Sequence, residues 1–387
     1  MNSLSFKWHQ SISQIKKKDW FLLTSNNVNP FFQWNWLNAL EKSESISLLY
    51  GWKPNHLTVW NNKRLIGFAP LYLKNHSYGE FIFDQAFARL AYQLNLQYYP
   101  KLIGMSPLSP VEGYKFFIAK NQNQSEITQM MMSKIDQFAI ENNILSCNFL
   151  YVDQQWQKHA AEANCISWVN KQSLWSSNGE KNFDEYLQRF NSNQRRNIRR
   201  EQQSIINNGI QISILNSDDI DLKIINKMYL LYKTHCLKWG QWGSKYLRSE
   251  FFEYSINDEI NKNIVLFNAN RGDIQDPIAM SLCVTDREML WGRYWGSNEE
   301  IKNLHFNLCY YAPISWAINN GVTRFDPGAG GSHKSRRGFP AKPCFSLHRW
   351  YDKRMESILI KYLPSINNLT AKEINASNNE VPFKSMS

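Results

Sequence analysis

Apolar and polar positions alternate with the period of a strand in two separate stretches of the chain. LTVWNNKRLIGFAPLYLK, from Leu57 to Lys74, predicts a strand, a polar turn and a second strand, which together form an antiparallel hairpin. Residues 265–286 repeat this plan, and EMLWGRYWG, from Glu288 to Gly296, predicts a third strand after them. The recurrence suggests that one α+β unit is duplicated along the chain.

Helical periodicity fills the stretches between these strands. Residues 125–143 and 220–237 space apolar side chains on one helix face, and further helices are expected at 85–96 and 304–320. In each half, a helix leads into a short strand and a loop rich in Pro and Gly. The residues after about 365 contain few apolar side chains, which predicts a flexible tail.

Length and composition favour two globular domains. A chain of 387 residues exceeds one ordinary core, and its 43% hydrophobic content, with 15 Trp, 18 Tyr and 22 Phe, excludes global disorder. We expect a first domain over residues 1–176 and a second over 177–364, which includes a basic helix at 194–208, with the flexible tail at 365–387. The expected fold class is α+β, with mainly antiparallel mixed sheets flanked by helices.

Charge narrows the class of partner. Lys and Arg total 44 against 33 Asp and Glu, a formal net charge of +11, so the surface either attracts a polyanion or only keeps the protein hydrated. Nucleic acid, CoA and anionic lipid intermediates are all polyanions of this kind.

The spacing of cysteines and histidines and the sequence of the N-terminus indicate the cellular location and whether a metal is bound. The six Cys occur singly and the eight His lack zinc-site spacing, so we expect reduced thiols and no bound metal. The N-terminus lacks the apolar core of a secretory signal, and no window reaches the roughly 18 apolar residues of a membrane span. The expected location is the cytoplasm, and any membrane contact is expected to be peripheral.

The basic helix concentrates cations on one face. Glu201 is the only acidic residue near its four arginines, so neutralising partners one turn away are scarce. The face is either an ordinary solvated surface or a phosphate-binding surface, since guanidinium groups match the forked oxygens of phosphate. Within about 140° of the helix circumference, opposite Ile198, lie Arg195, Arg196, Arg199 and Arg200.

RFDPGAGGSHKSRRGF, at residues 324–339, combines glycines and cations after a predicted strand. Glycines with positive φ can turn backbone N–H groups toward an anion, and the cations can supply its countercharge, although an ordinary Gly-rich turn has the same composition. The residues of this loop that we expect to bind the phosphate groups of a substrate are Gly328, Gly330, Gly331, Lys334, Arg336 and Arg337.

Side chains that could take part in proton transfer lie at the start of this loop and on the strand that precedes it. Asp326 and His333 are both candidates for the base, because both lie where the predicted strand opens into the glycine loop. Their alternative roles are a turn-capping Asp and a surface His. Tyr294 can orient a carbonyl or relay a proton, or it can be a core residue. No G-x-S-x-G elbow is present, which favours direct transfer over an acyl-enzyme.

Several stretches together resemble the bacterial FemAB-like predicted N-acyltransferases, in order and spacing, from about residue 30 to 350. The match weakens at Ser332, where relatives often carry an acidic residue before the histidine. The stretches are KNHSYGEFIFD (Lys74–Asp84), YYPKLIGMSPLSPVEG (Tyr98–Gly113), NQRRNIRRE (Asn193–Glu201), LWGRYWG (Leu290–Gly296), LHFNLCYYAPISWAINNG (Leu304–Gly321) and GSHKSRRGF (Gly331–Phe339).

The resemblance implies a tandem of two GNAT-type domains and an acyltransferase activity. The family is related to enzymes that build peptidoglycan cross-bridges by transferring amino acids from aminoacyl-tRNA. The acceptor would then carry an amine, as in a cell-wall precursor or a small metabolite.

The segment Arg293–Phe306 bears on the identity of the acyl donor. It lacks the R/Q-x-x-G-x-G/A loop that holds the pyrophosphate in CoA-dependent GNAT enzymes, so aminoacyl-tRNA is favoured over acyl-CoA as cosubstrate. No permanently bound cofactor is expected. The alternatives are an acyl-CoA-dependent N-acyltransferase acting on a small metabolite and a non-catalytic nucleic-acid-binding module that uses the arginine helix alone.

Overall fold

The computed structural model describes residues 4–25, 28–238, 240, 245–257, 259–272 and 276–384. By its internal contacts, the chain divides into two compact units, and each is described by itself below. Unit 1 comprises Met1–Lys171 and Pro343–Lys372, and unit 2 comprises Gln172–Lys342 and Glu373–Ser387.

Unit 1 contains two sheets, with strand orders β1-β3-β4-β7 and β2-β5-β6-β8-β16-β9. The expected hairpin is confirmed, because β3 and β4 pair antiparallel across the polar turn. The parallel neighbours β6 and β8 are joined through α4. The strands are β1 (Leu4–His9), β2 (Trp52–Pro54), β3 (His56–Asn61), β4 (Arg64–Ala69), β5 (Tyr72–Lys74), β6 (Lys101–Gly104), β7 (Phe117–Ile118), β8 (Ser146–Phe149), β9 (Ile166–Ser173) and β16 (Ala341–Trp350).

The helices of unit 1 bury one face each. In α4, the Asn123 side chain caps the first turn by accepting from the N–H of Glu126, and Met131 and Ile135 pack into the core, as the apolar spacing predicts. The α-helices are α1 (Lys17–Thr24), α2 (Trp34–Lys42), α3 (Gln85–Gln93), α4 (Gln124–Glu141) and α5 (Gln154–Glu162). Short 3₁₀ turns are η1 (Ile12–Gln14), η2 (Pro30–Phe32) and η3 (Leu48–Tyr50).

The chain returns to unit 1 near its end, which differs from the expected second domain over 177–364. Strand β16 inserts between β8 and β9 and pairs antiparallel with β8, from Leu347 opposite Phe149 to Trp350 opposite Ser146. A strand paired across such a sequence distance has no local signature, so only the tertiary structure assigns it.

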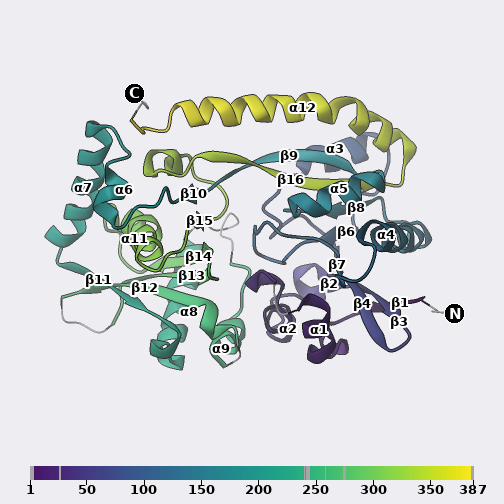
Figure 1. Cartoon of the computed structure of the whole chain (residues 1–387), viewed down its shortest axis with the longest axis horizontal. Coiled ribbons are helices and arrows are strands. Elements are labelled where there is room, and N and C mark those ends of the chain that lie inside the picture. The colour runs from purple at the N-terminus through teal and green to yellow at the C-terminus, as the bar shows by residue number, and fades with distance from the viewer. Residues whose placement is uncertain are drawn as a thin grey trace. The chain divides into compact units, whose positions relative to one another are not determined.

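The flexible tail expected at residues 365–387 is wrong for most of its length. Helix α12 (Lys353–Asn379) continues through it, as the yellow ribbon of Figure 1 shows. In unit 1, the amide of Asn367 donates to the carbonyl of Ser167 and accepts from the N–H of Val169. In unit 2, Asn378 makes the same pair of bonds with Ala341. Asparagines that suggest disorder in the sequence here satisfy the backbone of strands.

Unit 2 contains one sheet of order β10-β15-β14-β13-β12-β11. The predicted hairpin and third strand are confirmed, because β12, β13 and β14 form an antiparallel meander. Figure 1 shows α8 and α11 on opposite sides of these strands. The strands are β10 (Trp175–Ser176), β11 (Ile210–Leu215), β12 (Ile264–Arg271), β13 (Ala279–Thr285), β14 (Met289–Ser297) and β15 (Arg324–Asp326).

Helix α8 packs directly on β14. Gly296 permits this approach, because a Cβ there would collide with the backbone carbonyl of Leu231. The helices of unit 2 are α6 (Phe183–Leu187), α7 (Ser192–Asn207), α8 (Leu222–Leu237), α9 (Ser249–Asn257), α10 (Leu304–Phe306), the π-helical segment η7 (Asn307–Tyr311) and α11 (Ala312–Asn319). The 3₁₀ turns are η4 (Ser217–Asp219), η6 (Asn261–Asn263) and η8 (Ser332–Arg337).

Candidate functional site

The candidate site of unit 2 begins where two parallel strands separate. Strands β14 and β15 pair only from Met289 opposite Arg324 to Trp291 opposite Asp326, and β14 continues to Ser297. A register shift against β13 leaves Arg293 as the extra residue of a bulge. The carboxyl ends of neighbouring parallel strands are a common place for a ligand crevice.

Asp326 closes the start of the glycine loop. Its carboxylate pairs with the Arg293 guanidinium, Oδ2 to Nη2 at 2.7 Å, and its Oδ1 accepts from the N–H of Gly328 at 2.8 Å. Both side chains are buried. Since both oxygens are engaged, Asp326 holds the bulge and the loop together and is poorly placed for its expected role as the base.

The glycines of the loop adopt the expected left-handed conformation, with φ of 82° at Gly328, 70° at Gly330 and 85° at Gly331. The ammonium of Lys334 lies inside this turn and donates to the carbonyl of Gly328 at 2.6 Å. Burial lowers the pKa of Lys334 to about 8. Contrary to expectation, Lys334 holds the loop itself instead of facing an external anion.

Arg337 is also engaged inside the protein. Its guanidinium donates to both carboxylate oxygens of Glu201, at 2.8 and 3.0 Å, and lies 3.3 Å from the centre of the Phe306 ring. Tyr311 donates its hydroxyl to the same carboxylate. Arg337 is therefore poorly placed for the countercharge role expected of it, whereas Arg336 is exposed.

The structure brings together two basic features that are far apart in the sequence. Gln194 of α7 donates its side-chain amide to the carbonyl of Arg336 in η8, at 2.7 Å. Together with the bond between Arg337 and Glu201, this contact places the start of the basic helix beside the glycine loop.

The four arginines of α7 differ in their partners. Arg196 is exposed and has no ion-pair partner in the described part of the chain, and Arg199 forms only an exposed pair with Asp184 at 3.5 Å. Arg200 donates to the Asn197 side chain, and Arg195 donates to the carbonyl of Phe190. The helix therefore keeps a cationic outer face.

Tyr294 lies in the core of unit 2. Its ring packs against Tyr232 at 5.6 Å and Phe252 at 5.9 Å between ring centres, and its side chain is 8% exposed. These contacts fit the core role that the sequence allowed for Tyr294 better than a role in chemistry.

A cavity of about 480 Å³ lies at the carboxyl end of β14. Trp295, Ile301 and Leu304 supply apolar walls, and two imidazoles, those of His235 and His305, reach into it. Neither His235 nor His305 is among the site residues expected from the sequence. Only the fold reveals this site, because its walls come from α8, β14 and α10.

His333 stands next to this cavity. It is half-buried, and its Nε2 shares a hydrogen bond of 2.9 Å with the Tyr310 hydroxyl. Its ring centre is 5.8 Å from that of His305. Burial, together with the nearby charges of Arg337 and Lys334, lowers the pKa of His333, so the ring is neutral at physiological pH.

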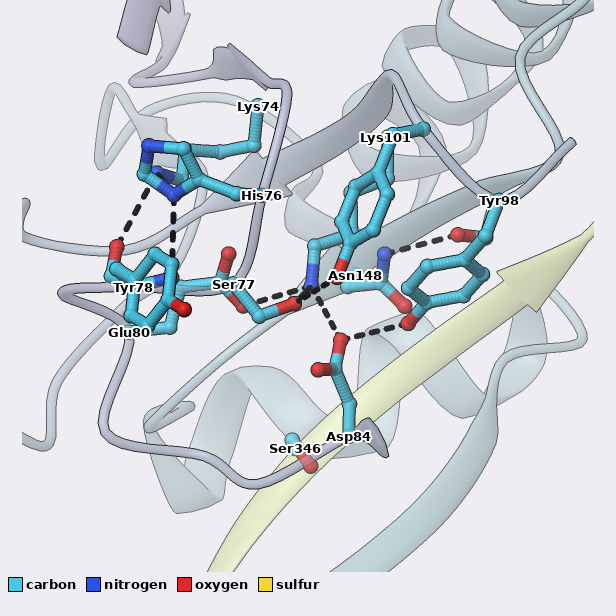
Figure 2. Close-up of polar contacts among 12 residues, drawn as sticks. Lys74, His76, Ser77, Tyr78, Glu80, Asp84, Tyr98, Lys101, Asn148 and Ser346 are labelled. Atoms are coloured by element: carbon cyan, nitrogen blue, oxygen red, sulfur yellow. Dashed lines mark hydrogen bonds and ion pairs between the residues drawn. The ribbon is translucent and has the colours of Figure 1, made fainter. Parts of the chain in front are cut away.

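Unit 1 contains a second polar centre, which sequence reasoning did not identify. Figure 2 shows Ser77, Glu80 and Asp84 converging on the ammonium of Lys101. Lys101 donates to Ser77 Oγ and Glu80 Oε2, both at 2.8 Å, and to Asp84 Oδ2. Tyr98 donates its hydroxyl to the same Asp84 oxygen at 2.6 Å.

Lys74 lies directly opposite Lys101 across β5 and β6 but has different partners. Its ammonium donates to His76 Nδ1 and to the carbonyl of Tyr78, both at 3.1 Å, and lies 4.0 Å from the Trp52 ring centre. Burial lowers its pKa to about 7. Lys101 is therefore compensated by carboxylates, whereas the acceptors that Lys74 contacts directly in the described part of the chain are neutral.

The sequence profile of the FemAB-like family, described as peptidoglycan biosynthesis and recognition, matches residues 11–385. The chain belongs to the FemAB-like family. This confirms the resemblance read from the motifs and places the chain among the N-acyltransferases. No curated protein matches the chain in sequence.

Solved structures share the fold of this FemAB-like chain at low identity. FemX is 11% identical, with 93% of this chain and 100% of FemX covered and a TM-score of 0.50. The C-terminal domain of a protein assigned as a lysylphosphatidylglycerol synthetase, from Agrobacterium fabrum, is 8% identical, with 90% and 96% covered and a TM-score of 0.54. A tandem GNAT protein of the clavulanic acid biosynthesis pathway is 8% identical, with 90% and 98% covered and a TM-score of 0.47.

The expected α+β fold is confirmed, because both units contain sheets flanked by helices and the fold is shared with FemX. The family also bounds the possible partners: an acyltransferase has a donor and an acceptor. Within the described residues, no helix combines the length and the apolar character needed to cross a membrane.

Proposed function

We propose that this FemAB-like protein transfers an acyl or aminoacyl group directly from a phosphate-bearing donor, with aminoacyl-tRNA favoured, to an amine acceptor. The observation that carries the proposal is the contact of the basic helix α7 with the glycine loop through Gln194 and Arg336, beside the cavity at the end of β14. A polyanion on this face would lie next to a pocket large enough for an acyl group.

The cations that remain exposed indicate the type of acyl donor. Arg196, Arg200 and Arg336 face solvent, whereas Lys334 and Arg337 are engaged inside. A face of separated guanidinium groups suits a phosphate backbone better than the compact pyrophosphate of CoA, for which residues 293–306 lack the usual glycine spacing. The acceptor is proposed to be a cell-wall precursor, in keeping with the family description.

Catalysis by this site requires no covalent intermediate. Cys283 is buried and Cys309 is partly buried, and burial raises the pKa of the thiol in both, so neither is suited to attack an acyl donor. A neutral imidazole beside the cavity can accept the amine proton, and His333, a candidate for the base in the sequence, is one of the imidazoles found there.

Incubation with bulk charged tRNA and a pool of amine acceptors, including cell-wall precursors, tests the proposal. The expected result is acceptor-dependent release of the amino acid from tRNA, and release no faster than without protein contradicts it. Each phosphate contact adds roughly 0.7–0.9 to the slope of log affinity against log salt, so Arg196→Ala combined with Arg336→Ala should flatten that slope by about 1.5. Glu180→Gln, on a carboxylate of unit 2 away from this face, serves as the control.

The second candidate is transfer from acyl-CoA. It is favoured by one observation, namely that the cavity lies between the end of β14 and α10, where the sequence places the donor loop of CoA-dependent GNAT enzymes. Saturable binding of acetyl-CoA by calorimetry, with no binding of tRNA, would select this donor. Binding of tRNA without any transfer would instead select the nucleic-acid-binding module.

A further inference from the structure

His305 occupies a position that neither the motifs nor the glycine loop indicated. It lies in α10, directly after the loop that leaves β14, and its ring lines the cavity. Its ring centre is 4.9 Å from that of Trp295 and 5.3 Å from that of Tyr310, and the Tyr310 ring stands at 90° to it. Two aromatic walls therefore hold the imidazole in one orientation.

The two imidazoles of the cavity differ in their hydrogen bonds. The indole N–H of Trp295 donates to His235 Nε2 at 3.1 Å, so that lone pair is already engaged. Among the residues that the structure describes, no group bonds to either ring nitrogen of His305. A lone pair that reaches a cavity and is bonded to no protein group is available to a ligand.

The environment keeps His305 neutral. Burial lowers its pKa to about 3, and the neighbouring His333, His235, Arg337 and Lys334 act in the same direction. The ring is therefore neutral at physiological pH, and its lone pair carries no added proton. A base with so low a pKa is weak, so it can take the proton only after C–N bond formation has made the amine nitrogen acidic.

We propose that His305 is the catalytic residue that takes the proton from the acceptor amine. This inference rests on the proposed acyl transfer and assigns its proton-transfer step. The amine nitrogen attacks the ester carbon, a C–N bond forms, and the amine proton moves to a ring nitrogen of His305. The C–O bond to the donor then breaks, the leaving oxygen receives the same proton, and the neutral imidazole is restored.

The remaining groups act as positioning residues. The Tyr310 hydroxyl holds His333 through a hydrogen bond of 2.9 Å, and His333 in turn packs against the ring of His305 at 5.8 Å between centres. Tyr310 lies in the π-helical segment η7, a rare backbone form that is common at functional sites. The segment places the Tyr310 ring against that of His305, which lines the cavity.

The test is chemical rescue of His305→Ala with bulk charged tRNA and the pool of amine acceptors. A positioned general base contributes about 10²- to 10⁴-fold, so kcat should fall by that factor, and millimolar imidazole should restore part of it by entering the vacated space. His235→Ala opens the same cavity, but its effect should be smaller and imidazole should not restore it. His305→Gln keeps the size and polarity of the ring but cannot carry the proton, so it should stay folded by circular dichroism and be as slow as His305→Ala.

The outcomes separate the two proposals. If wild-type protein transfers nothing from any donor, the proposed function is wrong and the assignment of His305 fails with it. If wild-type protein is active, three results overturn the role of His305 alone: full activity of His305→Ala, full activity of His305→Gln, or equal rescue of His235→Ala by imidazole. A loss of activity in His305→Ala that imidazole does not relieve, with His305→Gln active, would mean that the ring only fills space.

Discussion

The two units use buried polar groups in opposite ways. In unit 1, the Lys101 ammonium has three oxygen partners and is 1% exposed, so the charge is compensated and closed off from solvent. In unit 2, two imidazoles, those of His235 and His305, line the cavity together with charged side chains of its rim, and the buried cations Lys334 and Arg337 are engaged by the protein itself. The difference teaches that a buried charge can serve the structure alone, so a group beside a cavity that is bonded to no described residue is the better candidate for chemistry.

The largest effect is expected from Lys101→Met. Removal of the ammonium leaves Glu80 and Asp84 buried without a counter-ion, which should lower the free energy of unfolding by about 3–5 kcal/mol. Chemical denaturation measures this change. Lys115→Met is the matched control, because Lys115 is exposed and lies 3.9 Å from Asp153, and it should change stability by less than about 1 kcal/mol. Equal effects of the two variants would mean that the cluster in unit 1 is not a closed ion network.

Arg337→Lys should have the next largest effect, because it tests whether the loop cation of unit 2 is structural. A lysine keeps the charge but loses the two bonds to Glu201 and the stacking on Phe306, so we expect a loss of about 1–3 kcal/mol in the free energy of unfolding. Arg324→Lys, at the exposed pair with Glu288, should change it by less than about 0.5 kcal/mol. If Arg337→Lys leaves stability unchanged but weakens binding of the donor, Arg337 binds an anion and its role is not structural.

Lys74→Met should act with the opposite sign to Lys101→Met. The pKa of Lys74 is lowered to about 7, so between pH 7 and its unfolded value the unfolded chain binds more protons and stability rises with pH. Replacement by an apolar side chain of similar size should raise the free energy of unfolding at pH 7 by about 1–2 kcal/mol, and the gain should shrink by pH 10. Denaturation of the wild type and the variant at pH 7 and pH 10 measures the gain and its decrease with pH. A loss of stability at both pH values would contradict the proposed difference between Lys74 and Lys101.

The smallest effect is expected from Asp184→Ala. It removes the exposed ion pair with Arg199, so stability should change by less than about 0.5 kcal/mol. The same variant removes a negative charge from the face of α7, so tRNA binding measured by filter retention should strengthen slightly at low salt. A large loss of stability would show that the helix face is held internally and is not a docking surface.

Much of the local structure was predictable from the sequence. The hairpins at residues 57–74 and 265–286 follow from strand-period alternation, and α4 and α8 follow from helical spacing, because these patterns act between neighbours in the chain. The motifs also sufficed for the family. The position of the glycine loop was predicted correctly. Its cations were expected to face an external anion, but Lys334 and Arg337 are engaged inside the protein.

What the sequence by itself determined was therefore the hairpins and helices with clear periodicity, the family and the positions of the basic helix and the glycine loop. The tertiary structure alone decided that β16 inserts into the sheet of unit 1, that asparagines anchor α12, and that His305 lines a cavity while Asp326 pairs with Arg293. The physical reason is that a side chain's partner is set by contacts between distant segments. Periodicity records only which residues share a face, so it cannot tell a compensated charge from an available lone pair.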